Sequence, residues 1–161
     1  MEIRKAREED MSTILQIYAI AREFMKKNGN PTQWADGYPQ ESVLRKDLKE
    51  ENLYVCEEDG VVKGVFSFIM GDDPTYQHIQ GGWHRNAAYG AIHRVASDGT
   101  LRGLAAQIFS YCQERSSYLR IDTHRDNHPM QHVLRKFGFQ DCGIIWAANG
   151  SERIAFDLYA K

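Results

Sequence analysis

Apolar residues recur three or four positions apart in four segments of the chain, a spacing that predicts amphipathic helices. These segments cover residues 11–28, 39–49, 101–112 and 130–137. Runs rich in β-branched and aromatic residues lie between them and predict strands. The predicted strands cover residues 2–6, 53–57, 61–69, 89–97, 118–123, 139–148 and 151–159.

The order of these elements along the chain indicates the class of fold. Asp59-Gly60 and Asn149-Gly150 each join two predicted strands, and both dipeptides favour two-residue hairpin turns. Helices separated by antiparallel hairpins, with one strand-helix-strand crossover in the middle, predict a mixed α/β sheet of the α+β type rather than a doubly wound sheet. No repeat, low-complexity tract or linker divides the chain, so we expect residues 1–161 to form a single domain.

The charge and hydropathy of the chain exclude several classes of partner. Twenty Lys and Arg oppose 22 Asp and Glu, and the formal net charge of -2 disfavours a nucleic-acid duplex as partner. The N-terminus has no apolar signal core, and no apolar run approaches the roughly 20 residues that span a bilayer. We therefore expect a cytoplasmic protein with no nucleic-acid or membrane partner.

Neither the cysteines nor the histidines predict a metal site. The cysteines lack a Cys-x-x-Cys spacing and lie in apolar stretches typical of a core: Cys56, Cys112 and Cys142. Three histidines recur every four residues and would share one face if all were helical: His124, His128 and His132. Asn127 and Pro129 indicate that the helix begins inside this triplet, which separates His124 from the other two. We expect no bound metal.

A strand, a tight turn and a helix follow one another over residues 92–105. The free N–H groups and the positive dipole end at the start of a helix bind a pyrophosphate without many charged side chains. Small residues at Gly103 and Ala105 would let phosphates approach the backbone. A glycine before a helix is also a common plain cap, so the turn alone leaves both interpretations open.

Two motifs in the chain resemble those of the GNAT superfamily of acetyltransferases. Gly103 and Ala105 stand on the small positions of its acetyl-CoA motif, Arg/Gln-x-x-Gly-x-Gly/Ala, although Thr100 occupies the first position and the turn is slightly short. Asn127, followed by a helix that ends in Gly138-Phe139, resembles the second signature. The resemblance covers nearly the whole chain, and residues 117–145 are similar to those of uncharacterised bacterial GNAT proteins.

This resemblance implies a fold, a co-substrate and a set of contacts. The fold would be a mixed sheet of about six or seven mostly antiparallel strands, splayed in the middle, with about four helices on its two faces. Acetyl-CoA would be the co-substrate and a small-molecule, amino-acid-like or peptide amine the acceptor. The residues implied to bind acetyl-CoA are Val95, Ala96, Ser97, Leu101, Arg102, Gly103, Leu104, Ala105 and Asn127.

The family reaction requires a base for the incoming ammonium and tolerates or protonates the leaving thiolate. In many relatives a tyrosine seven residues after the signature Asn acts as the general acid that protonates the leaving sulfur. Here that position is Leu134, which we expect to be core. His93 lies where several relatives carry a base, four residues before Ser97, and is the favoured candidate. Asp122 and His124 are alternatives, and a structural role remains open for all three.

The acceptor side of the site is less defined by sequence. Four aromatic residues occupy loops or strand ends that wall the substrate cleft in this family: Trp34, Tyr38, Trp83 and Tyr89. Exposed aromatics there could equally pack locally or form a homodimer contact. Two rival functions stay open. One is an acyltransferase that uses a longer acyl-CoA, and the other, suggested by Leu134, is an acetyl-CoA-binding domain that acts as a sensor or has lost activity.

Overall fold

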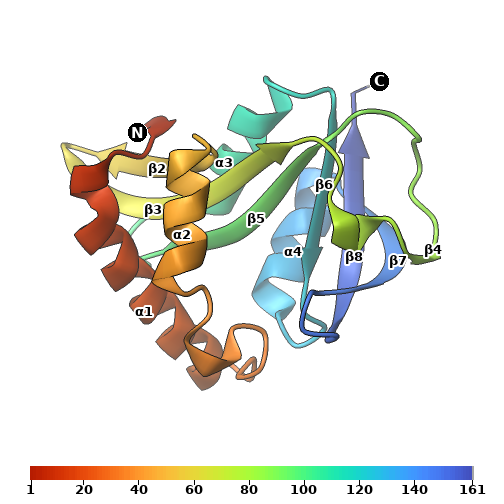
Figure 1. The fold of residues 1–161 in the computed structure, drawn as a ribbon, viewed down its shortest axis with the longest axis horizontal. Coiled ribbons are helices and arrows are strands. Elements are labelled where there is room, and N and C mark those ends of the chain that lie inside the picture. Colours follow the sequence, from red (N-terminus) through yellow and green to blue (C-terminus); the bar gives the residue numbers. More distant parts are fainter. Residues whose placement is uncertain (161) are drawn as a thin grey trace.

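The computed structural model describes residues 1–160, in which eight strands form one open sheet (Figure 1). The strands are β1 (Glu2–Lys5), β2 (Leu53–Glu58), β3 (Val61–Met70), β4 (Gln80–Gly81), β5 (Gly90–Ser97), β6 (Tyr118–Thr123), β7 (Gln140–Trp146) and β8 (Glu152–Tyr159). Their spatial order is β1-β2-β3-β5-β6-β8-β7-β4. Every neighbouring pair is antiparallel except β5 and β6, which are parallel.

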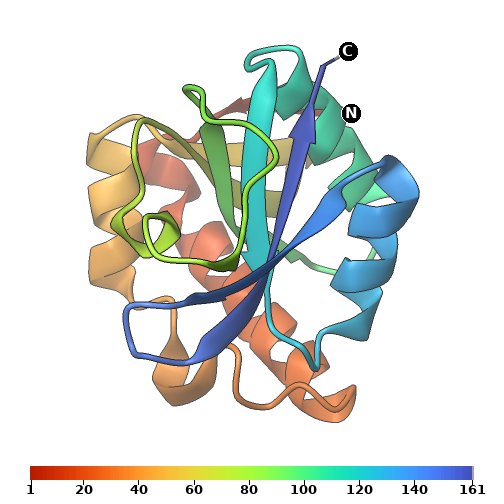
Figure 2. The same cartoon turned by 90° about the vertical axis from the view of Figure 1, so that its right-hand side faces the viewer.

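Four α-helices cover the two faces of this sheet. They are α1 (Met11–Lys27), α2 (Glu41–Lys49), α3 (Leu104–Gln113) and α4 (His128–Phe137), with short 3-10 turns at Glu8–Asp10, Ala35–Gly37 and Pro74–Tyr76. Figure 2 shows α1 and α2 on one side of the sheet and α3 and α4 on the other. The mixed, mostly antiparallel sheet with helices on both faces confirms the predicted fold class. None of the helices in residues 1–160 is long and apolar enough to cross a membrane.

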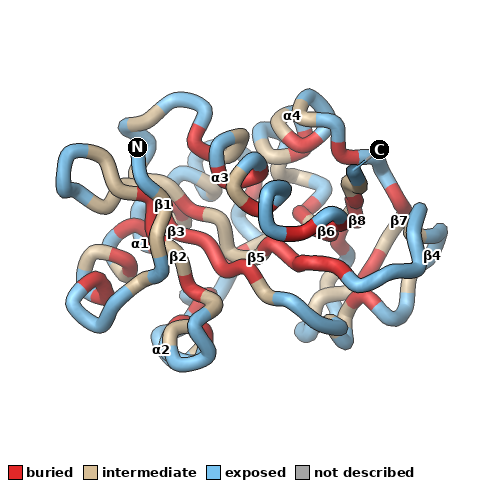
Figure 3. Tube along the Cα trace, turned by 90° about the horizontal axis from the view of Figure 1, so that it is seen from above, coloured by how far each residue is buried: buried red, intermediate tan, exposed pale blue. Residues whose placement is uncertain are grey.

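The alternation of side chains along the strands builds a separate core on each face. In β2, Leu53 and Val55 belong to the core with α1 and α2, whereas Cys56 belongs to the core with α3 and α4. This period of two is the expected result for a strand buried on both faces. Figure 3 shows buried residues running along the central strands, with exposed residues on the outer turns of the helices and in the loops.

Several element boundaries differ from the sequence prediction for physical reasons. Helix α3 begins at Leu104 rather than 101, because Gly103 before it has a left-handed backbone (φ 70°) that no helix residue adopts. The strand β4 was not predicted, since two residues carry no alternating pattern. Asp10 does precede α1, but its carboxylate makes no cap hydrogen bond and pairs with Arg4 at 2.8 Å instead.

The cysteines and histidines lie largely as predicted. All three cysteines are buried. Helix α4 begins at His128, so His124 precedes it and is buried, whereas His128 and His132 are exposed on the helix. The His124, His128 and His132 triplet therefore does not gather around one point.

The middle of the sheet opens where β5 and β6 diverge (Figure 1). These two parallel strands pair only over Gly90–Ile92 and Leu119–Ile121. Beyond Ile92, β5 carries a bulge against β3, and Arg94 in the bulge has a left-handed backbone (φ 53°). The predicted splayed sheet is thus confirmed, and amides on the β6-facing edge of β5 have no strand partner there. We call this opening the fork.

Candidate active site

The fork brings together two of the three residues that the sequence singled out as bases. His93 is the first residue of β5 beyond the parallel pairing, and Asp122 is the first such residue of β6. The His93 Nδ1 and Asp122 Oδ2 atoms lie 4.0 Å apart, and both side chains are largely but not fully buried. A histidine and a carboxylate at the divergence of two strands are positioned to accept or donate a proton there.

A residue that the sequence analysis missed, Asp73, orients the His93 ring. The His93 Nε2 lies 2.7 Å from Asp73 Oδ2, while Asp73 Oδ1 accepts hydrogen bonds from the amide and hydroxyl of Thr75. Burial raises the pKa of Asp73, but the hydrogen bonds from His93 and Thr75 outweigh it and bring the pKa to about 2. An ionised carboxylate at Nε2 favours the tautomer with hydrogen there, which leaves the Nδ1 lone pair toward the fork.

The Asp73 carboxylate therefore acts as a positioning group, and its removal has a testable effect. In Asp73→Asn the amide can also present its NH2 group to Nε2, which would favour the wrong tautomer of His93. We expect kcat to fall by about tenfold or more with little change in KM for acetyl-CoA. Steady-state kinetics across pH measures this, with Asp59→Asn in the distant β2–β3 hairpin as the matched control. An unchanged kcat and pH profile would show that Asp73 only anchors its loop.

Asp122 is held by two neighbours and is less free to accept a proton. The Tyr76 hydroxyl donates to Asp122 Oδ2 at 2.6 Å, and Arg153 Nε lies 3.9 Å from Oδ1. Burial, reinforced by the charge of Asp122, raises the pKa of Tyr76 well above its ordinary value, so this phenol stays a neutral donor. Both carboxylate oxygens thus already have a partner.

His124 is bonded through both ring nitrogens and fixes a loop. Its Nδ1 accepts the amide of Asp126 at 3.0 Å, which assigns the hydrogen to Nε2, 3.1 Å from the Thr32 hydroxyl. Burial, followed by the charge of Arg153, lowers the pKa of His124, so the ring is disfavoured as a cation. Of the three candidate bases, His93 is the best placed to accept a proton, through its Nδ1 atom.

The aromatic residues expected at the acceptor cleft divide into two groups. Trp34 and Tyr89 are buried rather than exposed: Trp34 packs edge-on against Tyr18, and the Tyr89 hydroxyl accepts the amide of Asp73. Tyr38 and Trp83 are half-buried. The Tyr38 hydroxyl accepts a hydrogen bond from Arg94, and the Trp83 ring nitrogen donates to the Tyr76 carbonyl. Tyr38 and Tyr89 thus contact Arg94 and Asp73 beside the fork, whereas Trp34 belongs to the core with α1 and α2.

A groove of about 340 Å³ lies beside the fork. Helix α2, the residues after β3 and the bulge of β5 line it, and Asp73 links it to His93. Its charged lining residues are Lys46, Asp47, Glu50, Asp72, Asp73 and Arg94. Arg94 is neutralised by Asp47 at 2.8 Å, so the remaining lining is predominantly acidic. The sequence did not reveal this groove, because its acidic residues come from two distant segments.

The turn from β5 leads to the start of α3, the place where the sequence predicts an anion-binding site. Side chains already bond the amides of Gly99 and Thr100, the former through Ser97 Oγ and the latter through Asp98 Oδ1. The amides at the start of α3, which begins at Leu104, have no intrahelical acceptor by the geometry of any helix. Gly103 is exposed and a Cβ there would meet no atom within 4 Å, so its left-handed backbone rather than crowding favours glycine.

The other residues implied to bind the cofactor lie around this turn and differ in how far they are buried. Ala96 and Leu104 are buried, so only their backbone can face a ligand. The half-buried residues are Val95, Ser97, Leu101 and Ala105, and Arg102 is exposed. Asn127 caps α4 through Oδ1 to the Met130 amide and donates to Gln33, so both ends of its side-chain amide have partners.

Leu134 occupies the position where the sequence comparison with relatives would place a tyrosine general acid. It is completely buried. It belongs to the core between the sheet and helices α3 and α4. The prediction that this residue is core is confirmed.

Comparisons with known proteins identify the family. No protein-family model and no curated protein matches the chain. Among solved structures, an acetyltransferase of the GNAT family from Streptococcus agalactiae is 32% identical to it, with a TM-score of 0.91, over 99% of this chain and 95% of that one. At this identity over nearly the full length of both proteins, the chain belongs to the GNAT family of acetyltransferases.

Two more distant structures share the fold and contain CoA thioesters. The protein yncA of Salmonella typhimurium, solved with its cofactor acetyl-CoA, is 15% identical with a TM-score of 0.63, over 99% of this chain and 94% of that one. GphF, a GNAT-like decarboxylase solved with isobutyryl-CoA, is 12% identical with a TM-score of 0.71, over 99% of both chains. At such low identity these two comparisons concern the fold alone.

Proposed function

We propose that the protein transfers an acetyl group from acetyl-CoA to the amine of a small molecule, an amino-acid-like compound or a peptide. The observation that carries the proposal is that His93 lies at the fork while the same strand leads into the start of helix α3. Ser97 ends β5 four residues after His93, so one strand would serve both the reacting thioester and the CoA phosphates. Acetyl-CoA in yncA and isobutyryl-CoA in GphF support a CoA thioester as ligand.

The proposed reaction assigns His93 as the base. Its Nδ1 removes a proton from the acceptor ammonium, directly or through one water, while Asp73 holds the ring through Nε2. The amine lone pair then attacks the thioester carbonyl carbon, the carbon–sulfur bond breaks, CoA leaves as a thiolate, and the acylated nitrogen releases its remaining extra proton to solvent. Unpaired amides on the β6-facing edge of β5 would stabilise the developing oxyanion.

No side chain needs to act as the acid in this scheme. Leu134 has no proton to donate, and the hydroxyl of Tyr76 is committed to Asp122. A thiol has an ordinary pKa of about 8.5, so its thiolate is a fair leaving group at neutral pH. The thiolate can take a proton from solvent after transfer.

The groove beside the fork supports a cationic amine as acceptor. Among residues 1–160, Asp72 and Glu50 line it without an ion pair, whereas Asp73 lies 2.7 Å from His93 and Asp47 lies 2.8 Å from Arg94. Such a surface favours the approach of a protonated amine over that of an acid. We therefore infer that the acceptor enters from the α2 side of the fork.

Binding of the cofactor can be tested apart from catalysis. Acetyl-CoA at about 100 times its Kd should stabilise the fold by about 2.7 kcal/mol, because it binds the folded state alone. For a domain of this size that is a rise in Tm of roughly 5–10 °C. In Gly103→Glu a side chain of like charge would enter the phosphate site, and we expect the shift to vanish. Thermal melts with and without acetyl-CoA measure it.

The control for this measurement is Gln107→Glu, which adds the same charge one turn later on the exposed face of α3. It should keep most of the stabilisation by acetyl-CoA. Equal shifts for wild type and Gly103→Glu would mean that the phosphates bind elsewhere.

The proposed activity is tested by incubating the protein with acetyl-CoA and a panel of amines while following free thiol. Amine-dependent thiol release supports acetyl transfer. A longer acyl-CoA that reacts faster than acetyl-CoA would favour the acyltransferase alternative, to which the isobutyryl-CoA in GphF gives some weight. Stabilisation by acetyl-CoA without thiol release for any amine would favour a sensor.

A further inference from the structure

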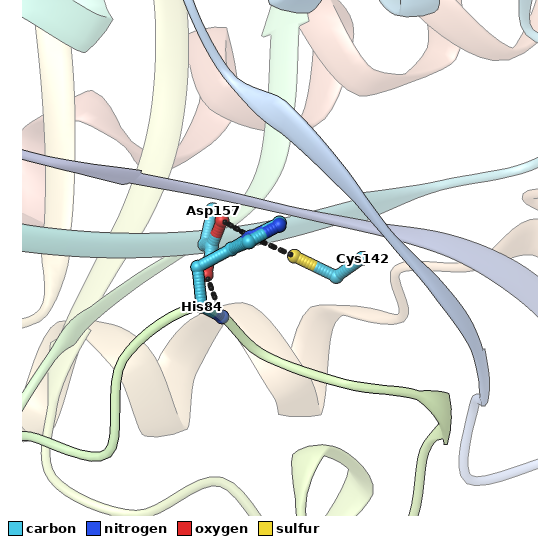
Figure 4. Close-up of side chains that lie close together, drawn as sticks. All are labelled: His84, Cys142 and Asp157. Atoms are coloured by element: carbon cyan, nitrogen blue, oxygen red, sulfur yellow. Dashed lines mark hydrogen bonds and ion pairs between the residues drawn. The ribbon is translucent and has the colours of Figure 1, made fainter.

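A second group of polar side chains comes together in the sheet beyond β6, on the side away from β5 and His93. His84 comes from the connection between β4 and β5, Cys142 from β7 and Asp157 from β8. The three side chains point toward one another (Figure 4), and their ligand-type atoms all lie within 4.8 Å of each other. His84 Nδ1 is 2.7 Å from Asp157 Oδ1 and 3.4 Å from Cys142 Sγ.

This group does not have the arrangement of a nucleophilic triad. In a triad the carboxylate and the nucleophile bond opposite ring nitrogens of the histidine. Here Asp157 and Cys142 both approach Nδ1. Burial, reinforced by the hydrogen bond with Asp157, also raises the pKa of the Cys142 thiol, which makes it a poor nucleophile.

The surroundings hold the Asp157 carboxylate in place and leave one oxygen toward the other two residues. Asp157 is completely buried, and its Oδ2 accepts hydrogen bonds from the His84 amide and the Tyr118 hydroxyl, both at 2.8 Å. Oδ1 faces the His84 ring and the thiol. Hydrogen bonds to the outer oxygen of a ligating carboxylate are a usual feature of metal sites.

The distances come close to those of a tetrahedral zinc site. Zinc bonds of about 2.0–2.3 Å place neighbouring ligands about 3.3–3.8 Å apart. The Sγ–Nδ1 distance of 3.4 Å already fits, and the Nδ1–Oδ1 distance of 2.7 Å would lengthen by a small rotation of the His84 ring. Such a rotation is feasible because the His84 side chain is 38% exposed.

The donor set also selects the metal. One imidazole nitrogen, one thiolate and one carboxylate suit Zn²⁺, whereas Mg²⁺ and Ca²⁺ prefer oxygen ligands alone. We propose that His84, Cys142 and Asp157 bind one Zn²⁺ ion, with water as the fourth ligand on the exposed side. The ion would tie the connection that carries Trp83 and Tyr89 to the C-terminal strands, and so stabilise one wall of the fork region.

The test measures metal binding directly and does not depend on acetyl transfer. Protein dialysed against a chelator is titrated with Zn²⁺ and, as a spectroscopic probe, with Co²⁺. We expect one Zn²⁺ per chain, a higher Tm with Zn²⁺, and cobalt spectra with a thiolate charge-transfer band and the visible bands of a tetrahedral site. Cys142→Ala should abolish the charge-transfer band, and His84→Gln should weaken affinity by about tenfold or more.

Matched controls change the same residue types elsewhere in the chain. His78→Gln alters an exposed histidine between β3 and β4, and Cys112→Ala alters a buried cysteine of α3. Both should bind Zn²⁺ as the wild type does. If Cys142→Ala does not fold, His84→Gln decides the outcome, since its side chain is partly exposed.

Three results would overturn the proposal. One is less than one Zn²⁺ bound per chain at saturating metal. Another is full Zn²⁺ affinity in folded Cys142→Ala or in His84→Gln. The third is a Co²⁺ spectrum of octahedral type without a thiolate band.

Discussion

Replacing His93 by alanine should lower kcat by about a hundredfold or more while leaving acetyl-CoA affinity nearly unchanged. The reason is that the side chain lies at the fork, beyond the last β5–β6 pair, and not at the turn that would hold the phosphates. Losing only a proton-transfer step costs about 10²- to 10⁴-fold. Steady-state kinetics and acetyl-CoA titration by thermal shift measure the two effects separately.

The pH dependence of this variant gives an independent readout. A general base must be unprotonated to act, so the acidic limb of the pH–rate profile reports the protonation of the base. That acidic limb should flatten in His93→Ala. His78→Ala, which changes an exposed histidine, should keep the wild-type profile. If acetyl-CoA affinity collapses together with the rate, His93 positions the cofactor and Asp122 or His124 becomes the better candidate.

Leu134→Ala should destabilise the protein by about 2–5 kcal/mol. Leu134 is completely buried between the sheet and helix α3, so truncation leaves a cavity as well as losing apolar contact. For a domain of this size that corresponds to a drop in Tm of roughly 4–20 °C. Urea and thermal unfolding followed by circular dichroism measure the change.

The control for Leu134 is His132→Ala, two residues earlier on the same helix and exposed. It should change stability by no more than about 0.5 kcal/mol. A Leu134→Ala protein with an unchanged melting curve would contradict the packing of this residue. Leu134→Tyr, where it folds, tests whether an acid at this position raises the rate.

The fold was predictable because its signals are local. The Asp59-Gly60 hairpin formed as expected, with left-handed backbones at both residues (φ 52° and 79°). Helical spacing located α1 and α4 closely. The sequence prediction missed β4, which is a strand only because Gln80 and Gly81 pair with the distant strand β7. The start of α3 was misplaced because Leu101 continues the apolar spacing although Gly103 interrupts the helix.

The candidate site was predictable only in part. Sequence position singled out His93, four residues before the end of β5, and Asp122, one residue before the end of β6. It could not identify Asp73, whose contact with His93 depends on the path of the connection from β3 to β5. The same connection brings His84 to Cys142 and Asp157, residues 58 and 73 positions away in sequence. Long connections leave no periodic pattern, so their contacts appear only in three dimensions.

The most direct test of the central claim, that the fork is an acetyl-transfer site, is mass spectrometry of reactions that contain acetyl-CoA and the amine panel. The account predicts an acetylated amine and free CoA in equal amounts with the wild-type protein, and at least about a hundredfold slower formation of both with His93→Ala. Acetyl-CoA binding without any acetylated amine, or equal rates of product formation in the two proteins, would contradict it.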